Sequence, residues 1–167
     1  MEEAIRKGVL CKYLYYPHVV SLTSEEMEVY VKLSEKIAKY FNYNTCSFNK
    51  MDDTLMMLLL ARKRIVHKAV NKLEVFEKII KKRYQEKGNL KYSLVYVPEG
   101  IEPNFLEEDD DSLSQDDDSE HLIDLYTKSI LQLDESITVR KFVSGQKDRE
   151  TILEEFASGR LQVLTSM

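Results

Sequence analysis

The first half of the chain places apolar residues at helical spacing, interrupted by short polar stretches. Thr23 or Ser24 can cap a first long helix, with acidic residues in its first turn. Its apolar positions are Met27, Tyr30, Val31, Leu33, Ile37 and Tyr40. The turn-prone segment 41–50 then breaks the pattern, and two further helices are predicted, over about 52–68 and 71–87. The buried stripe of the last helix is predicted to be Leu73, Phe76, Ile79 and Ile80.

The second half alternates short apolar runs with amphipathic segments. Strands are predicted for "YSLVYVP" (92–98), "ITVRKFV" (137–143) and "LQVLTS" (161–166), and helices for "HLIDLYTKSILQL" and "DRETILEEFASG". Strand, helix, strand, helix, strand at this spacing predicts a parallel βαβαβ unit with right-handed crossovers. The run 92–98 is almost wholly apolar, so that strand is expected to be covered on both faces. The fold class is therefore α/β, with a parallel sheet flanked by helices.

An N-terminal region precedes these elements. The segment "EEAIRKG" (2–8) is predicted to form a short helix ended by Gly8. The following residues are rich in β-branched and aromatic side chains, but Pro17 favours an edge strand or a linker over a central strand. We therefore expect a linker over 1–22, a helical segment over 23–69 and an α/β part over 70–167.

Acidic residues are concentrated in one tract. Of the 29 Asp and Glu residues, nine lie in 107–120, which contains no Lys or Arg. The remaining 20 acids face 24 Lys and Arg, so the net charge of −5 becomes +4 outside the tract. The tract predicts a disordered loop over about 100–119, and it lacks the Asp spacing and Gly turn of a calcium loop. The mildly basic remainder permits a polyanionic partner.

Composition narrows the class of protein further. Hydrophobic residues make up 43% of the chain, which suffices for a core. Cys11 and Cys46 have no metal-like spacing and are expected to be buried, reduced thiols of a cytosolic protein. The start carries acids and resembles no signal peptide, and the apolar run 54–61 is too short to cross a bilayer. We therefore expect a cytoplasmic protein without a membrane partner.

The sequence contains no complete catalytic constellation. It has no Gly-rich phosphate-binding loop, dinucleotide fingerprint or nucleophile elbow, and His18, His67 and His121 stand apart from Cys and from each other, so no metal site is predicted. Ligands of parallel sheets bind at the carboxyl ends of the strands. There, Ser144 and Gly145 can offer backbone N–H groups to a phosphate. Alternatively, they only turn the chain.

The charges beside that turn also have two interpretations. Lys147 and Arg149 follow Ser144 and Gly145 within the same stretch of sequence. They would add positive charge to a phosphate site. In the alternative interpretation, Arg149 pairs with nearby acids.

The order of segments resembles the second RecA-like domain of a superfamily-two helicase of the restriction-type and XPB-like DNA translocases. The segment "NKLEVFEKIIKKRYQEKGNLKYSLVYVPEG" is similar to the helix and strand of the fourth helicase motif. The block "VRKFVSGQKDRETILEEFASGRLQVLTSM" resembles the strand, Ser-Gly turn, helix and opening strand of the fifth. "LLLARKRIVHKAVNKL" and "EEAIRKGVLCKYLYYPHVVSLTSEEMEVY" are similar to the preceding helix and interdomain linker.

This resemblance implies ATP-driven translocation on nucleic acid, with nucleotide and magnesium held between two RecA-like domains. It favours DNA over RNA as the nucleic acid and leaves both open. The missing first domain would be a partner. The residues implied to contact the nucleic-acid backbone are Pro98, Glu99, Ser144, Gly145, Thr165 and Ser166. No ATP-binding residue of this chain is assigned.

The sequence also departs from the helicase pattern. The Walker motifs belong to the first domain, the fifth motif stops at "LTSM", and the sixth motif is absent. The long acidic insertion after the fourth-motif strand is also unusual for the family. We therefore expect a segment of a longer helicase, a hydrolase acting on ATP, that by itself binds no cofactor and hydrolyses no ATP.

Two other classes of function remain open. The chain could be a non-catalytic α/β module that binds a protein through its helical half. A small nucleotide-binding enzyme is disfavoured by the missing phosphate loop. An exposed sheet edge is also expected to let the chain self-associate.

Overall fold

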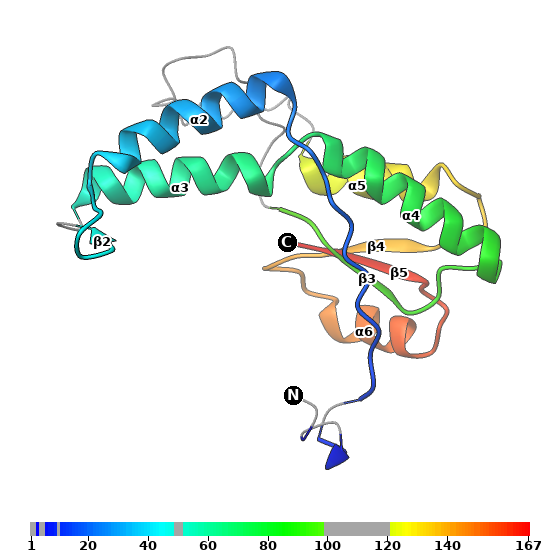
Figure 1. Ribbon diagram of the computed structural model, residues 1–167. Coiled ribbons are helices and arrows are strands. Elements are labelled where there is room, and N and C mark those ends of the chain that lie inside the picture. The colour runs from blue at the N-terminus through cyan, green and yellow to red at the C-terminus, as the bar shows by residue number, and fades with distance from the viewer. Residues whose placement is uncertain (1–2, 4–5, 10, 49–51, 99–120) are drawn as a thin grey trace.

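The computed structural model describes residues 3, 6–9, 11–48, 52–98 and 121–167. An arm of two antiparallel helices leads into an α/β part that contains a three-stranded sheet (Figure 1). The predicted tract over about 100–119 and the predicted contact at Glu99 lie outside the described residues. None of the helices in these ranges has the length and apolar character needed to cross a membrane.

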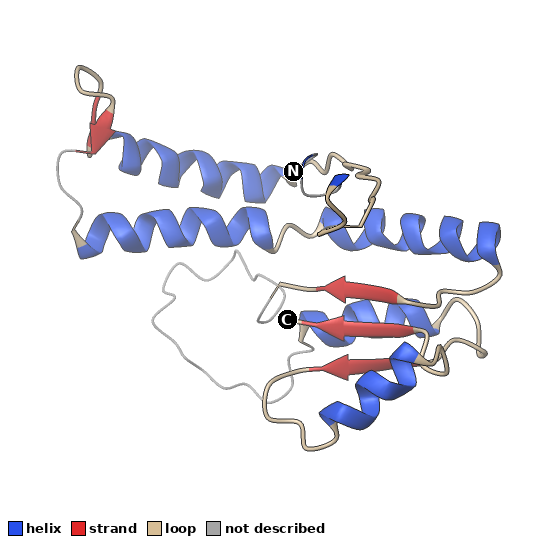
Figure 2. Ribbon diagram, turned by 90° about the horizontal axis from the view of Figure 1, so that it is seen from below, coloured by secondary structure: helices blue, strands red, loops and turns tan. Residues whose placement is uncertain are grey.

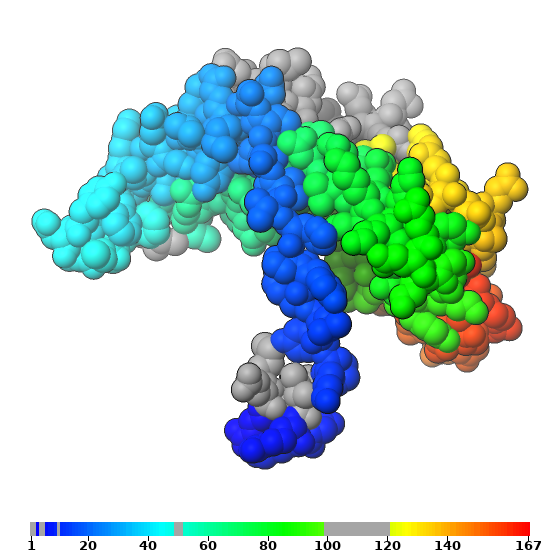
Figure 3. Space-filling view, turned by 45° about the vertical axis from the view of Figure 1, so that its right-hand side comes forward, coloured from blue at the N-terminus to red at the C-terminus, as the bar shows by residue number. Residues whose placement is uncertain are grey.

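The N-terminal residues extend away from the body of the molecule (Figure 3). Lys7 N–H donates to the Glu3 carbonyl over 2.9 Å, and Gly8 has a φ of 71°, as expected for a glycine that ends a short helix. Residues 11–23 contain no helix or strand, and the side chains of Leu14, Tyr15 and Val19 are exposed. Cys11 and Cys46 are also exposed, so the prediction that the two thiols are buried is wrong. Near the end of the stretch 11–23, the Asn71 side chain donates to the Ser21 carbonyl over 2.8 Å. The linker over 1–22 and the other domain boundaries stay a prediction.

Side-chain caps fix the start of each helix of the arm. Helix α2 spans Ser24–Ala38, and Thr23 Oγ1 accepts from Glu26 N–H while Glu26 accepts from Thr23 N–H. Helix α3 spans Asp53–His67, and Asp52 accepts from Leu55 N–H over 2.8 Å. The cap at Thr23 was predicted from the sequence, whereas Asp52 was predicted only as the approximate start of its helix.

The segment predicted to be only a polar break contains a small hairpin. Strands β1 (Phe41–Asn42) and β2 (Ser47–Phe48) pair antiparallel, and the Phe41 and Phe48 rings meet edge to face at 5.5 Å. The hairpin joins α2 to α3 (Figure 1). Its strands are too short for period-two alternation to reveal them.

The predicted buried stripes are partly wrong. On α2 the side chains of Met27 and Val31 are exposed, while Glu26 and Ile37 are buried. On α4 (Asn71–Lys87) Ile80 is buried but Ile79 is exposed. Apolar spacing gave the helical period, but the neighbouring helix sets which side is covered. Glu26 occupies a buried position because it caps backbone N–H groups.

The three predicted strands share one parallel sheet, which confirms the predicted fold class. Strands β3 (Ser93–Tyr96), β4 (Val139–Phe142) and β5 (Val163–Ser166) lie in the order β3-β5-β4 (Figure 2). Ser93 pairs with Val163, and Val139 pairs with the same residue from the other side. The last strand in sequence is therefore the central one. This sheet with its flanking helices is consistent with part of a RecA-like fold.

The expectation that β3 is covered on both faces is wrong. Leu94 is 47% exposed and Tyr96 is 74% exposed, whereas Val95 packs against the core on the other face. Strand β3 is an edge strand. Helix α6 (Arg149–Ala157) covers the face of the sheet that carries Leu94 and Tyr96, but it lies near β4, at the opposite edge from β3 (Figure 2). The fully covered strand is β5, where Val163, Leu164 and Thr165 are buried.

Helices cover the sheet from two sides. Helices α4 and α5 (Leu122–Leu131) lie on one face and α6 on the other (Figures 1 and 2). The first face holds the core cluster of Ile80, Leu90, Ile130, Ile137 and Val163. A neighbouring cluster contains Val97, Leu122 and Tyr126, and the opposite face holds Ile152, Leu161 and Leu164.

Burial of Tyr126 predicts an alkaline limit to stability. Burial raises the pKa of the Tyr126 phenol above its ordinary value, because an apolar environment disfavours the phenolate. The contribution of the neutral Tyr126 phenol to the free energy of unfolding is therefore complete below the unfolded-state pKa. It is lost as the pH rises through the folded-state pKa. Among the ten tyrosines, Tyr126 is expected to ionise late in an absorbance titration. Tyr126→Phe should remove that late step, whereas Tyr96→Phe, at an exposed ring, should leave it unchanged.

Candidate nucleic-acid interface

The carboxyl ends of the three strands lie at one edge of the sheet. Tyr96 and Phe142 both pair with Ser166, and Val97 N–H donates to the Ser166 carbonyl over 2.8 Å. The parallel register therefore brings together the points at which Pro98, the Ser144–Gly145 turn and Ser166 occur. These residues come from three separate segments, and the sequence analysis placed each of them at a strand end.

One side chain, that of Gln146, stabilises the Ser144–Gly145 turn by two hydrogen bonds to the backbone. Gln146 Oε1 accepts from Val143 N–H over 3.1 Å, and Gln146 Nε2 donates to the Lys141 carbonyl over 3.0 Å. Gly145 has a φ of 83°, which favours glycine, and a Cβ placed there would meet nothing within 4 Å. Ser144 and Gly145 are exposed. The tip is therefore fixed in shape and sterically open to an approaching backbone.

Of the two sequence interpretations of the charges beside this turn, the pairing of Arg149 with nearby acids is not seen among the described residues. Arg149, at the start of α6, lies over the Phe142 ring with its guanidinium 4.6 Å from the ring centroid. The acids instead pair with Arg140, which lies 3.3 Å from Asp148 and 3.9 Å from Glu155. The ring holds Arg149 beside the turn, where its positive charge is available.

Thr165 does not present its side chain at this edge. It is 0% exposed, and its hydroxyl lies 3.0 Å from the Thr127 hydroxyl of α5. On the same face, Lys141 forms an ion pair with Asp124 of α5. Both contacts attach α5 to the sheet. The contact predicted for Thr165 is therefore not available to its side chain in this structure, whereas Ser166 is only partly buried.

A basic cleft beside Pro98 was missed by the sequence analysis. Its volume is about 390 Å³, and it lies between the C-terminal end of α3 and the end of β3. Its lining residues are Leu60, Lys63, Arg64, His67, Lys68 and Pro98. A signal existed in "ARKRIVHK", where bases recur four residues apart, but the sequence did not show that Pro98 faces them.

The described residues do not fit a complete ATP–magnesium site. They include no Gly-rich loop that could surround a triphosphate, and they contain no cluster of three His, Cys, Asp or Glu side chains suited to a metal ion. Hydrolysis is therefore assigned to none of them.

Comparison with known proteins gave one structural similarity. No protein-family model matches the sequence, and no curated protein matches it. The crystal structure of the helicase domain of Pyrococcus furiosus Hef matches 84% of this chain with 20% sequence identity and a TM-score of 0.37. The chain covers 25% of that protein. A match at this level does not establish a family or a shared activity.

Proposed function

We propose that this chain is part of the second RecA-like domain of an ATP-dependent helicase or translocase. In the full-length protein it contacts the nucleic-acid backbone, DNA rather than RNA, and contributes half of an ATP–magnesium site shared with the first RecA-like domain. One observation carries the proposal: three strands from the motif-like segments form one parallel sheet, and their carboxyl ends share an edge.

The geometry of that edge suits backbone contact. Ser144 and Gly145 form an exposed tip, and Arg149 places a cation beside it. Small polar residues and backbone N–H groups bind phosphate oxygens without reading bases. Binding of this kind releases counterions and therefore weakens as salt is added.

Introducing a negative charge at the tip is expected to weaken binding of a fluorescent single-stranded oligonucleotide. Ser144→Glu should lower affinity roughly five-fold at low salt, because a carboxylate within a few ångström of a phosphate costs about 1 kcal/mol in water. Fluorescence anisotropy over a salt series measures this. Ser158→Glu is the matched control, since Ser158 is exposed at the end of α6 that leads back to the amino end of β5.

The control should bind as the unchanged protein does. Equal losses in the two variants would remove the sheet edge from the interface. Oligonucleotide binding that is insensitive to salt would contradict backbone recognition as a whole.

A second candidate function is binding of a protein through the helical arm. It is favoured by exposed apolar side chains on α2 and α3, namely Met27, Val31, Met56, Met57 and Leu60. A module of this kind would bind its partner with little dependence on salt and would not bind the oligonucleotide.

Self-association also remains part of the proposal. Within the described residues, β3 and β4 each have one edge that pairs with no other strand. Strand β4 carries the charged residues Arg140 and Lys141, which discourage edge pairing. Strand β3, with Leu94 and Tyr96 exposed, is therefore the edge through which two copies would associate.

A further inference from the structure

We propose that the basic cleft binds successive phosphates of a nucleic-acid strand through Lys63, Arg64 and Lys68, with His67 beside them. This would extend the backbone-contacting surface from the sheet edge onto the helical arm. The inference rests on the proposed function for the identity of its ligand, but it concerns residues that the helicase resemblance does not assign.

The cleft concentrates positive charge on one side of α3. Lys63 and His67 are four residues apart, as are Arg64 and Lys68, so each pair shares one side of the helix. The opposite wall contains Pro98, and none of the described residues that line the cleft is acidic. A volume of about 390 Å³ accommodates several atoms of a strand rather than a single small ion.

Within the described ranges, these cations have no carboxylate partner of the kind that neutralises several other bases of the chain. Lys32, Lys78 and Lys82 each pair with a glutamate one turn away on their own helices. For the parts of the chain that the structure describes, no carboxylate lies within ion-pair distance of Lys63, Arg64 or Lys68.

An unpaired cluster has a cost that a polyanion would remove. Like charges four residues apart destabilise a helix by a few tenths of a kcal/mol. The helix dipole favours bases in the last turn, which accounts in part for Arg64 and His67. The dipole does not explain why these residues line a cleft whose opposite wall contains Pro98. A bound strand would offset the repulsion by supplying the negative charge.

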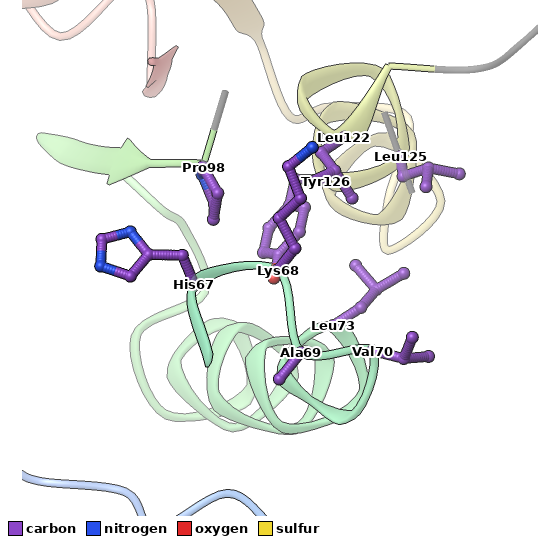
Figure 4. A pocket seen from close by; sticks show the side chains of 9 residues that line it. All are labelled: His67, Lys68, Ala69, Val70, Leu73, Pro98, Leu122, Leu125 and Tyr126. Carbon is purple, nitrogen blue, oxygen red and sulfur yellow. The ribbon is translucent and has the colours of Figure 1, made fainter. Parts of the chain in front are cut away.

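Two of the basic side chains of the cleft, Lys68 and His67, point in different directions. Lys68 extends towards α5, near Leu122 and Tyr126, whereas His67 points the other way, beside Pro98 (Figure 4). A single small anion would require donors that meet at one position. Donors that separate around Pro98 suit a chain of phosphates.

Pro98 connects this cleft to the sheet edge. It follows β3 at the edge that also contains Ser144, Gly145 and Ser166, and it forms part of the cleft wall. A strand that contacts the edge at Pro98 therefore continues directly into the basic cleft. The two surfaces form one path for a backbone.

The test compares two triple variants with the same change of charge. Lys63→Gln/Arg64→Gln/Lys68→Gln removes the cleft cations. Lys81→Gln/Arg83→Gln/Lys87→Gln removes two lysines and one arginine from exposed positions of α4 and serves as the control. Both are titrated with a fluorescent single-stranded oligonucleotide over a salt series, and their thermal unfolding is measured.

The cleft variant is expected to bind at least about 30-fold more weakly at low salt, and its salt slope should fall by about 2, since each lost phosphate contact removes about 0.7. The control should change affinity by less than about three-fold with an unchanged slope. The cleft variant should also unfold at the same temperature as the unchanged protein or higher, because like charges have been removed.

The outcomes separate this inference from the proposed function. Equal losses of affinity in the two triple variants would overturn the cleft site. If Ser144→Glu still lowered affinity as expected, the proposed function would stand. Loss of binding in the cleft variant alone, with Ser144→Glu silent, would support the cleft and contradict the sheet-edge contact. Absence of oligonucleotide binding at any salt, or binding of an acidic peptide in its place, would contradict both.

Discussion

Replacing Ile130 by alanine is expected to lower the free energy of unfolding by about 3–4 kcal/mol, the largest effect of any single change considered. Ile130 is 0% exposed and packs with Ile80, Leu90, Ile137 and Val163, so truncation would leave a cavity between α5, α4 and the sheet. Chemical denaturation followed by circular dichroism measures the loss.

The next residue provides a matched control. Leu131 belongs to the same helix and is 48% exposed, so Leu131→Ala should cost less than about 1 kcal/mol. Similar losses in the two variants would contradict the assignment of Ile130 to the core of the α/β part.

Replacing Glu26 by alanine is expected to cost about 2–3 kcal/mol, because two backbone donors lose their acceptor. One Glu26 oxygen accepts from Thr23 N–H over 2.8 Å, and the other accepts from Val70 N–H over 2.9 Å. Glu26 is 0% exposed. The side chain therefore caps α2 and also joins it to the turn between α3 and α4.

A charged neighbour adds to this effect. Burial lowers the pKa of Lys72, and the Glu26 carboxylate opposes that shift. Loss of Glu26 would leave the Lys72 ammonium partly buried without its nearby negative charge. Glu25→Ala is the control, since Glu25 is exposed in the same helical turn and carries the same charge.

An intermediate replacement refines the test. Glu26→Gln keeps one oxygen acceptor and should lose about half of the stability lost by alanine. Thermal unfolding by circular dichroism compares the three variants. If Glu25→Ala destabilised as much as Glu26→Ala, the loss would reflect the helix dipole instead of the two hydrogen bonds.

The regular elements could be predicted because local signals specify them. The last long helix runs from Asn71 to Lys87 as predicted, because Gly88 adopts the left-handed conformation, with a φ of 67°, that ends a helix. The three strands followed from short apolar runs between helical patterns. Their membership of one parallel sheet followed from the lengths of the intervening helices.

Coverage of the strands could not be predicted in the same way. The run that contains β3 is almost wholly apolar, yet the side chains of Leu94 and Tyr96 are exposed. Which strand lies in the centre depends on sheet order, and sheet order depends on long-range packing. The apolar run predicted that β3 is covered on both faces, and the sequence did not indicate that β5 lies between β3 and β4.

In the candidate site too, features set by local sequence were predicted and features set by long-range packing were not. Ser144 and Gly145 were predicted at the sheet edge because a turn after a strand is a local feature. The helicase resemblance implied that Thr165 contacts nucleic acid, but the pleat directs its side chain towards Thr127 of α5. The basic cleft was not predicted because Lys68 and Pro98 lie far apart in sequence, with α4 between them. Only the folded chain brings them to the same cleft.

The central position of β5 has a consequence for biosynthesis. Strands β3 and β4 pair with β5 and not with each other, so both remain without a ladder until residues 163–166 have left the ribosome. Closing the sheet then forms both ladders at once, over a long chain separation for β3, which slows the step. A nascent chain would meanwhile expose two unpaired strands, and recruitment of a chaperone before translation reaches Val163 would protect them from aggregation.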